Sequence, residues 1–378
     1  MNPAVQTAAD PQEMSAWLNL TLPSGIGPRT QQQLLRAFGH PSAVFAAGIS
    51  AVAGVIGIKP AQVLFDGSSS EVQQTLVHTT LDWLSEPGHH IVTLADKDYP
   101  QRLLESSDPP SLLYVNGDPG YLNRAAIGVV GSRNATPQGI ENALTFSRVL
   151  ADAGFTIISG LALGIDAAAH EGAIRSEAPS GTIAIIGTGI DRVYPASNRK
   201  LAYAVTSKGC IISEFPMGTV AAASNFPRRN RLIAGLSQAC LVVEAAPASG
   251  SLITARLAGE LGRDIFAIPG SIHAPQYKGC HALIKQGAKL VECAQDILEE
   301  LRPQATATTA ESVLSQPISN PVHHTLLDAL GHDPATLDQL IGRCGLTTDV
   351  VLAMLTELSL EGTVTNLPGG RYQRLIRS

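Results

Sequence analysis

The chain has 378 residues, 44% of them hydrophobic, so it is long enough for one large core with smaller domains beside it. Its formal net charge of −6 excludes a surface that is basic throughout, so any nucleic-acid binding would need a local basic region. The first residues do not resemble a secretory leader, and no apolar run approaches the roughly 18 to 20 residues of a membrane span. We therefore expect a cytoplasmic protein with no membrane contact.

The five cysteines also indicate a reducing compartment. They are odd in number and contain no CxxC pair, so neither a disulfide framework nor a cysteine metal site is predicted. We expect buried, reduced thiols at Cys210, Cys240, Cys280, Cys293 and Cys344.

Residues 1–86 are predicted to form a small helical domain. Apolar residues recur at helical spacing, with breaks at residues 23–28 and 57–60. The first break contains Gly25-Ile26-Gly27, which has the form of a helix-hairpin-helix turn whose amides can face a DNA phosphate. Few lysines or arginines lie nearby, so this pattern favours a packing turn over a DNA contact.

Residues 87–302 are predicted to form a large α/β domain. Apolar runs of strand length alternate with helical segments, such as residues 137–153, 164–177 and 251–261. This alternation is typical of an extended Rossmann-like fold, with a doubly wound, mostly parallel sheet covered by helices. The expected strands are residues 91–94, 112–115, 126–130, 155–159, 182–187, 210–213, 240–244, 265–268 and 289–291.

Three successive predicted strands are followed by glycine-rich turns. Ligands of open parallel sheets bind beyond the carboxyl ends of the strands, so these turns should lie side by side at a binding edge. Glycines allow close approach to a ligand, helix N-termini receive anions, and the guanidinium fork of Arg133 suits phosphate oxygens. The turn residues are Gly131, Ser132 and Arg133, then Gly160 and Gly164, then Gly187 and Gly189.

Cations and aromatic rings follow in two further segments. Between Arg192 and Arg231, seven basic residues face one acid, Glu214, inside an acidic chain. Arginines for a row of phosphates and rings for base stacking are what single-stranded DNA binding requires. The predicted contacts are Tyr194, Asn198, Arg199 and Lys200 after the third glycine-rich turn, and Phe226, Arg228, Arg229, Asn230 and Arg231 in a predicted fourth loop.

A second function stays open at this point, namely a nucleotide or N-glycoside hydrolase that uses the same edge. Asp166, Asp191, Glu214 and Glu244 all fall near strand ends, although capping of a helix is the favoured role for the first two. An NAD enzyme is not favoured, because the segment that starts at Gly131 lacks the G-x-G-x-x-G spacing.

The sequence predicts no metal site, no cofactor and no catalytic residue. Asp166 and His170 stand four apart on one predicted helix, but no further ligands have matching spacing. An Asp–His pair of this kind is more often a hydrogen bond than a metal site.

The C-terminal part is predicted to be a winged helix at residues 321–378, after a flexible linker at residues 303–320. Three short helices at 323–330, 336–344 and 347–360 precede a hairpin at 363–374. Residues 344–370 contain no lysine or arginine, whereas Asp349, Glu357 and Glu361 add negative charge. We therefore expect this domain to bind protein or another subunit, not DNA.

The ordered motifs of the α/β domain resemble the DNA-processing protein A family, DprA, also called Smf. The resemblance is dense over residues 98–301 and looser at both ends of the chain. The motifs that carry it are Gly131-Ser132-Arg133, residues 159–166, residues 187–191 with Tyr194-Pro195, residues 213–216, residues 226–237 and residues 249–255.

This resemblance implies a function for the whole chain. It implies a non-enzymatic protein of natural transformation that binds and protects incoming single-stranded DNA and helps to load the RecA recombinase onto it. It also implies a homodimer formed through residues 281–290, with His281, Ile284 and Leu290 as contacts.

Overall fold

A nine-stranded sheet forms the centre of the computed structural model, which describes residues 10–301, 321–331 and 333–375. Its strand order is β1-β2-β6-β5-β4-β3-β7-β8-β9, with all pairs parallel except β1 with β2 and β2 with β6. The strands are β1 His89–Thr93, β2 Leu112–Gly117, β3 Ala126–Val130, β4 Thr156–Ser159, β5 Thr182–Ile185, β6 Gly209–Ser213, β7 Ala239–Val242, β8 Asp264–Ala267 and β9 Lys289–Leu290.

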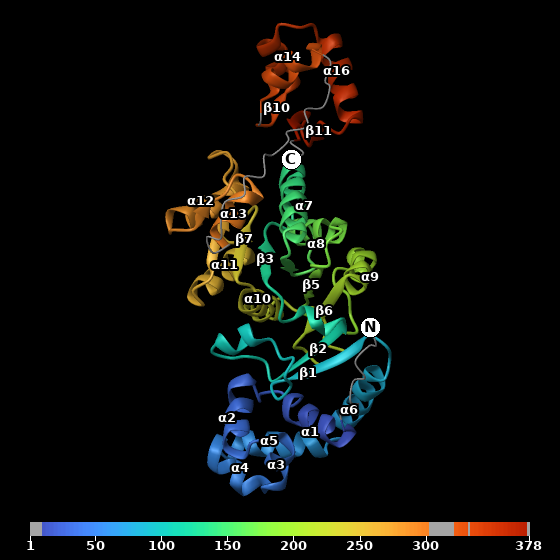
Figure 1. Ribbon diagram of the computed structural model, residues 1–378, viewed down its shortest axis with the longest axis vertical. Helices are drawn as coiled ribbons and strands as arrows, with labels where there is room; N and C mark the ends of the chain where they lie inside the picture. Colours follow the sequence, from blue (N-terminus) through green and yellow to red (C-terminus); the bar gives the residue numbers. More distant parts are fainter. Residues whose placement is uncertain (1–9, 302–320, 332, 376–378) are drawn as a thin grey trace.

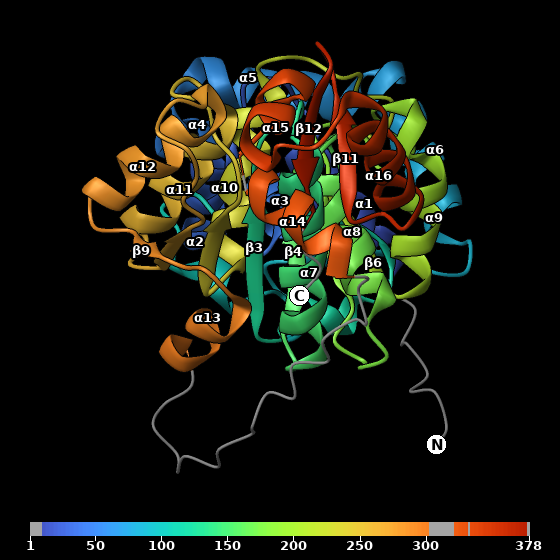
Figure 2. The ribbon, with the colours of Figure 1, turned by 90° about the horizontal axis from the view of Figure 1, so that it is seen from above.

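Helices cover both faces of this sheet, as Figures 1 and 2 show. Because side chains alternate along a strand, Ile127 and Val129 of β3 pack under α7 and α8, whereas Val130 faces the opposite core beneath α10. This two-sided burial explains why the central strands are apolar throughout. The helices are α7 Pro137–Asp152, α8 Ile165–Arg175, α9 Arg199–Ser207, α10 Asn225–Leu236, α11 Gly250–Glu260, α12 Lys278–Lys285 and α13 Ala294–Leu301.

Six N-terminal helices lie beside the β1–β2 end of the sheet (Figure 1). Met14 and Trp17 of the first helix share a core with Leu112 and Tyr114 of β2. The helices are α1 Pro11–Thr21, α2 Pro28–Phe38, α3 Pro41–Ala46, α4 Gly48–Ile56, α5 Ile58–Ser69 and α6 Glu71–Leu84. Short 3-10 helices lie at η1 Gln101–Glu105, η2 Pro119–Tyr121, η3 Ala196–Asn198 and η4 Pro275–Tyr277.

The C-terminal part has its own hydrophobic core and the order of a winged helix. Leu326, Leu340, Leu355 and Val364 are among its buried residues. Its elements are α14 Pro321–Leu330, β10 Ala335–Thr336, α15 Leu337–Cys344, α16 Thr348–Leu360, β11 Val364–Leu367 and β12 Arg371–Arg374. The two-residue strand β10, which pairs with β12, was not predicted because such a short strand has no readable period.

The predicted fold class is confirmed, including the mostly parallel sheet, the helical N-terminal part and the winged helix. The uniform burial predicted for the cysteines is wrong, since Cys293 is exposed and Cys344 is half-buried. The predicted linker at residues 303–320 lies outside the described residues. Within the described parts of the chain, no helix is both long and apolar enough to cross a membrane.

Candidate nucleic-acid interface

The carboxyl ends of β3, β4, β5 and β7 meet at one edge of the sheet. The chain runs outward from β3 through β4 and β5 to β6, then crosses to β7 on the other side of β3, so the topological switch point lies between β3 and β7. A pocket of about 700 Å³, here called the main pocket, opens at this point. The residues that matter most in its wall are Gly131, Ser132, Arg133, Asp166, Tyr194, Phe226, Arg229, Asn230, Ser249 and Ser251.

The turn after β3 is held by the turn after β4. The Ile165 amide donates to the Ser132 carbonyl at 3.1 Å, and the Ser132 hydroxyl accepts the Asn134 amide at 3.1 Å. Gly164 has a φ of 75°, and a Cβ there would lie 2.3 Å from the Ser132 carbonyl oxygen. Glycine alone combines an easily adopted positive φ with the absence of a Cβ, so the two turns can touch here. The Arg133 side chain remains exposed at the pocket.

Arg133 lies over an aromatic ring. Its guanidinium carbon is 4.9 Å from the centroid of the Phe226 ring, and the Tyr194 ring centroid is 6.0 Å from that of Phe226. These three side chains border a smaller cavity of about 230 Å³, which also reaches Gly160 and Gly187. The edge therefore offers a cation and two rings to a ligand that carries both charge and flat apolar faces.

A second guanidinium, that of Arg229, is buried below this surface. Arg229 is 4% exposed, and a Cβ at Gly160, which follows β4, would lie 1.7 Å from Arg229 Nη1, so a larger residue there would displace the guanidinium. Arg229 Nε has no hydrogen-bond partner within the described residues, although the side chain borders both the main pocket and the smaller cavity. The positive charge of Arg229 would attract an anion in the pocket strongly, because little water lies there to screen it.

The surroundings of Arg229 contain a buried acid, a neutral histidine and the positive charge of Arg133. Burial raises the pKa of Asp166, and the nearby positive charge of Arg229 counters that rise. Burial lowers the pKa of Arg229, while Asp166 counters that fall. Burial, helped by Arg229, also lowers the pKa of His170 to about 3, so its ring is neutral. His170 Nδ1 donates to the Thr182 hydroxyl at 2.7 Å.

The predicted arginine loop after β6 is a helix instead. Residues 226–231 form the start of α10, because Pro227 is tolerated in a first helical turn and Arg229, Leu232 and Ile233 face the core at helical spacing. Helical geometry sends the three arginines in different directions. Only Arg228 is exposed, at 56% of its side chain.

Arg231 is committed to an internal ion pair. Its guanidinium binds the buried carboxylate of Glu214 and also donates to the Asp108 carbonyl at 2.9 Å. Arg228 lies 3.8 Å from the same carboxylate and over the Phe215 ring. Two of the seven cations predicted as a free cluster thus balance one buried acid.

Other predicted contacts also have structural roles. Asn198 is buried and donates to the Leu161 and Ala162 carbonyls at 2.9 and 3.2 Å. Gly187 and Gly189 are buried. The Gly187 carbonyl accepts the Asn225 side-chain amide, and the Gly189 amide donates to the Thr219 carbonyl. Arg199 and Lys200 are exposed at the start of α9, outside the main pocket.

The far wall of the main pocket was not among the predicted contacts, although residues 249–255 carry part of the family resemblance. Ser249, Gly250 and Ser251 lie there at the N-terminus of α11, and Asn230 Nδ2 donates to the Gly250 carbonyl at 3.2 Å. The signal was present, because a Ser-Gly-Ser run after a buried strand marks a helix N-terminus at the switch point. This wall adds hydroxyls and free helix amides opposite Arg133.

The carboxylates do not assemble into a catalytic pair at the main pocket. Only Asp166 lines it. Asp191 accepts the Gly218 amide at 2.8 Å, so it does not cap the helix expected from its position. Glu244 accepts the amide of Thr136, the N-cap residue of α7, at 3.0 Å. Glu214 is paired with Arg231. The four acids thus hold loops and arginines in place.

Family models match nearly all of the described chain beyond the N-terminal helices. The model of DNA recombination-mediator protein A matches residues 90–302, and that of the DprA winged helix domain matches residues 308–370. The chain belongs to the DprA/Smf family. It is 40% identical to Protein Smf of Escherichia coli over 80% of this chain and 82% of that one. It is 43% identical to the DNA processing protein DprA of Streptococcus pneumoniae over 55% of this chain and 73% of that one.

Two solved structures of this family are similar to the chain. DprA from S. pneumoniae matches with a TM-score of 0.66 and 34% identity, over 77% of this chain and 99% of that one. DprA from Helicobacter pylori, a structure described for its single-stranded DNA binding mode, matches with a TM-score of 0.51 and 30% identity. That match covers 56% of this chain and 95% of the H. pylori chain.

Arg231→Ala should destabilise the fold by about 3 kcal/mol, because it leaves Glu214 buried without its partner. Arg228→Ala should cost less than about 1 kcal/mol, since that side chain is mostly exposed. Urea unfolding measures both. Burial already raises the pKa of Glu214, and without Arg231 this pKa rises further in the folded state. As the pH falls below that raised pKa, Glu214 becomes protonated and neutral in the folded variant. The stability difference between the wild type and Arg231→Ala should therefore shrink at low pH.

Glu214→Gln in the Arg231→Ala background is the matched control, since it removes the buried charge and should recover part of the lost stability. Equal unfolding midpoints for the wild type and Arg231→Ala would show that this ion pair contributes nothing to the fold.

Proposed function

We propose that this DprA/Smf protein binds single-stranded DNA at the main pocket and the surface around it, and that it catalyses no reaction there. The observation that carries the proposal is the combination of exposed Arg133 with the Tyr194 and Phe226 rings at the switch point. The structure of the H. pylori relative, described for its single-stranded DNA binding, supports it.

The ligand chemistry follows from the two kinds of group in the site. Arg133, the α11 N-terminus and the buried charge of Arg229 favour phosphate oxygens. The rings favour bases that are free of a complementary strand, because a base can stack on a side chain only when its face is accessible. A strand of nucleotides uses both, whereas one small anion would use only the cations.

The hydrolase alternative has less support. A hydrolase needs a carboxylate that can reach the scissile bond and accept or donate a proton. At the main pocket the available acid is Asp166, which is buried beside Arg229 and has no second carboxylate in the pocket wall.

The cellular role that we propose is protection of incoming single-stranded DNA during natural transformation and help in loading the RecA recombinase. Binding at the edge of a sheet leaves much of a long strand free beyond the protein. Such a complex is suited to passing DNA on to a polymerising recombinase.

Arg133→Ala should weaken binding of a fluorescent oligothymidylate while leaving the fold intact, because it removes an exposed phosphate partner that makes no internal ion pair among the described residues. The slope of log affinity against log salt should fall by roughly 0.7 for the lost contact. Fluorescence anisotropy at several salt concentrations measures both quantities.

Arg148→Ala is the matched control, since this exposed arginine pairs only with Asp152 within the same helix. If Arg133→Ala and Arg148→Ala bound DNA equally well, the proposal would be wrong.

We also propose that the chain forms a homodimer at the β9 end of the sheet. β9 is an edge strand with both residues exposed, and an open edge of this kind is a ready surface for pairing. Of the three contacts predicted, Leu290 is 49% exposed, Ile284 packs partly on the core, and the His281 ring binds the Gly270 carbonyl at 3.0 Å. Leu290 is therefore the residue whose substitution tests assembly without disturbing the fold.

Leu290→Glu should convert the dimer to a monomer, because an interface would have to bury an unpaired carboxylate. Light scattering coupled to size-exclusion chromatography gives the mass directly. Leu104→Glu, at a similarly exposed leucine on η1, is the control and should leave the mass unchanged. A dimeric Leu290→Glu protein would move the interface elsewhere.

For the winged helix we propose a protein partner, not DNA. On α16, Val350 and Leu352 are partly exposed, Leu360 is 85% exposed, and Asp349 lies in the first turn. Apolar and acidic side chains without a cation suit a protein surface better than a phosphate backbone.

A further inference from the structure

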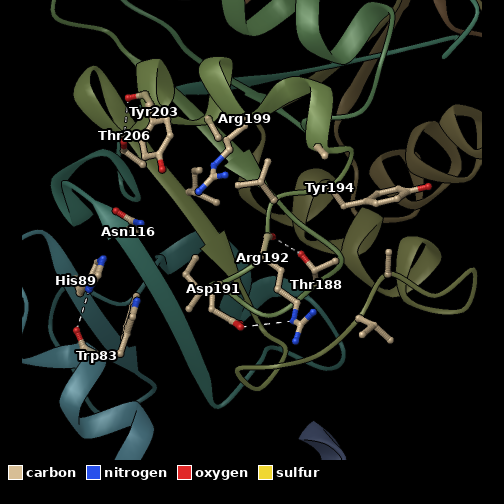
Figure 3. Close-up of a pocket in the computed structure, with 17 residues that line it drawn as sticks. Trp83, His89, Asn116, Thr188, Asp191, Arg192, Tyr194, Arg199, Tyr203 and Thr206 are labelled. Carbon is tan, nitrogen blue, oxygen red and sulfur yellow. Dashed lines mark hydrogen bonds and ion pairs between the residues drawn. The ribbon is translucent and has the colours of Figure 1, made fainter.

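A second pocket lies on the other side of Tyr194 from the main pocket. This side pocket has a volume of about 710 Å³ and shares Tyr194 and Ala221 with the main pocket, so the two are adjacent. Figure 3 shows side chains entering it from several parts of the chain. Trp83 and His89 come from the junction of α6 and β1, Arg199 and Tyr203 come from α9, and Asp191 and Arg192 come from the loop after β5. Residues of β2, of β6 and of the loop after β6 complete the lining.

The wall of the side pocket combines cations with one exposed ring, that of Tyr203, and with a largely buried ring pair. Arg199 points into the pocket in Figure 3 and makes no ion pair with an acid among the described residues. Tyr203 is 64% exposed beside it. On the opposite wall the His89 ring stacks on Trp83, with centroids 4.3 Å apart. Arg192 is exposed despite its contact with Asp191 at 3.5 Å.

The chemistry of the side pocket thus repeats that of the main pocket. Ile190, Val193, Ala202 and Ile211 add apolar lining. The one acid among its lining residues, Asp191, is held by the Gly218 amide and Arg192. A volume of this size accommodates a nucleotide-sized group, and an exposed ring beside the unpaired guanidinium of Arg199 suits a base with its phosphate.

We propose that the side pocket is a second nucleotide-binding subsite, which takes bases and phosphates of the same strand after it passes Tyr194. This inference rests on single-stranded DNA binding at the main pocket. Tyr194 stands between the two subsites, and in Figure 3 its ring extends away from the side pocket. The centroid of that ring is 6.0 Å from the centroid of Phe226. Arg199 and Tyr203 bind the continuation of the strand, and the junction of α6 and β1 forms the far wall.

The inference predicts a dependence on strand length. The double variant Arg199→Ala/Tyr203→Ala should bind a six-nucleotide oligothymidylate like the wild type, because the main pocket is intact. It should bind a twenty-nucleotide oligothymidylate at least about fivefold more weakly, since one stacked base and one phosphate contact are lost. Fluorescence anisotropy measures both lengths, and thermal unfolding checks that each variant is folded.

A crosslink gives a second, independent readout. A twenty-nucleotide strand with 5-iodouracil at single positions should crosslink to Tyr203 from one end of the strand, as identified by mass spectrometry. Arg148→Ala serves again as the surface control and should bind both lengths normally. These measurements use the full chain.

The outcomes separate this inference from the proposed function. If the double variant matches the wild type on both lengths, or loses equally on both, the side pocket is not a separate subsite, whereas the main-pocket proposal stands as long as Arg133→Ala still loses affinity. If the wild type binds neither oligonucleotide, both proposals fail together.

Discussion

The site depends on burying one guanidinium where the central strands end. Arg229 reaches the end of β4 from near the start of α10, and in this position its guanidinium occupies the space that a side chain at Gly160 would fill. An isolated charge in such a position is costly unless other charges or ligands compensate it. Asp166 supplies part of that compensation. The unpartnered Arg229 Nε beside the two cavities shows where a phosphate oxygen would supply more.

The same close packing fixes the exposed groups. Gly164 lies against the backbone of Ser132 and Arg133, and the Ile165 amide donates to the Ser132 carbonyl, so the turns after β3 and β4 are held together. Arg133 is thereby set over Phe226, and Phe226 is set beside Tyr194. A binding surface held in this way needs little reordering when a strand arrives, which favours affinity. The charged groups are few, in keeping with an acidic chain that concentrates its cations at one edge.

Much of the fold could be predicted from residue patterns. Strands buried on both faces, such as β3 and β7, read as continuous apolar runs, and helices between them implied parallel pairing. The antiparallel attachment of β1 and β2 has no local signature, because pairing direction depends on where the chain returns. The helix at residues 226–231 was predicted as a loop because three basic residues and a proline obscured its period.

The site was harder to predict than the fold, since sequence shows charge but not its partners. Arg133, Arg228, Arg229 and Arg231 look alike in the printed chain. In the structure Arg133 is exposed beside the Phe226 ring and Arg228 is about half-exposed. Arg229 is buried below the pocket, and Arg231 pairs with Glu214. Ser249 and Ser251 stood in a motif of the family but were not predicted as contacts, because a pair of hydroxyls carries no charge. Family resemblance could suggest a DNA site but could not separate these roles.

The central claim is that the sheet edge binds unpaired bases together with phosphates. The direct measurement is a titration of the full-length protein with a labelled single-stranded oligonucleotide and with the matching duplex, each at two salt concentrations. We predict tighter binding of the single strand at both salts, with affinity for either ligand falling as salt rises, because only unpaired bases can stack on Tyr194 and Phe226. Equal or tighter binding of the duplex at both salts would contradict the account.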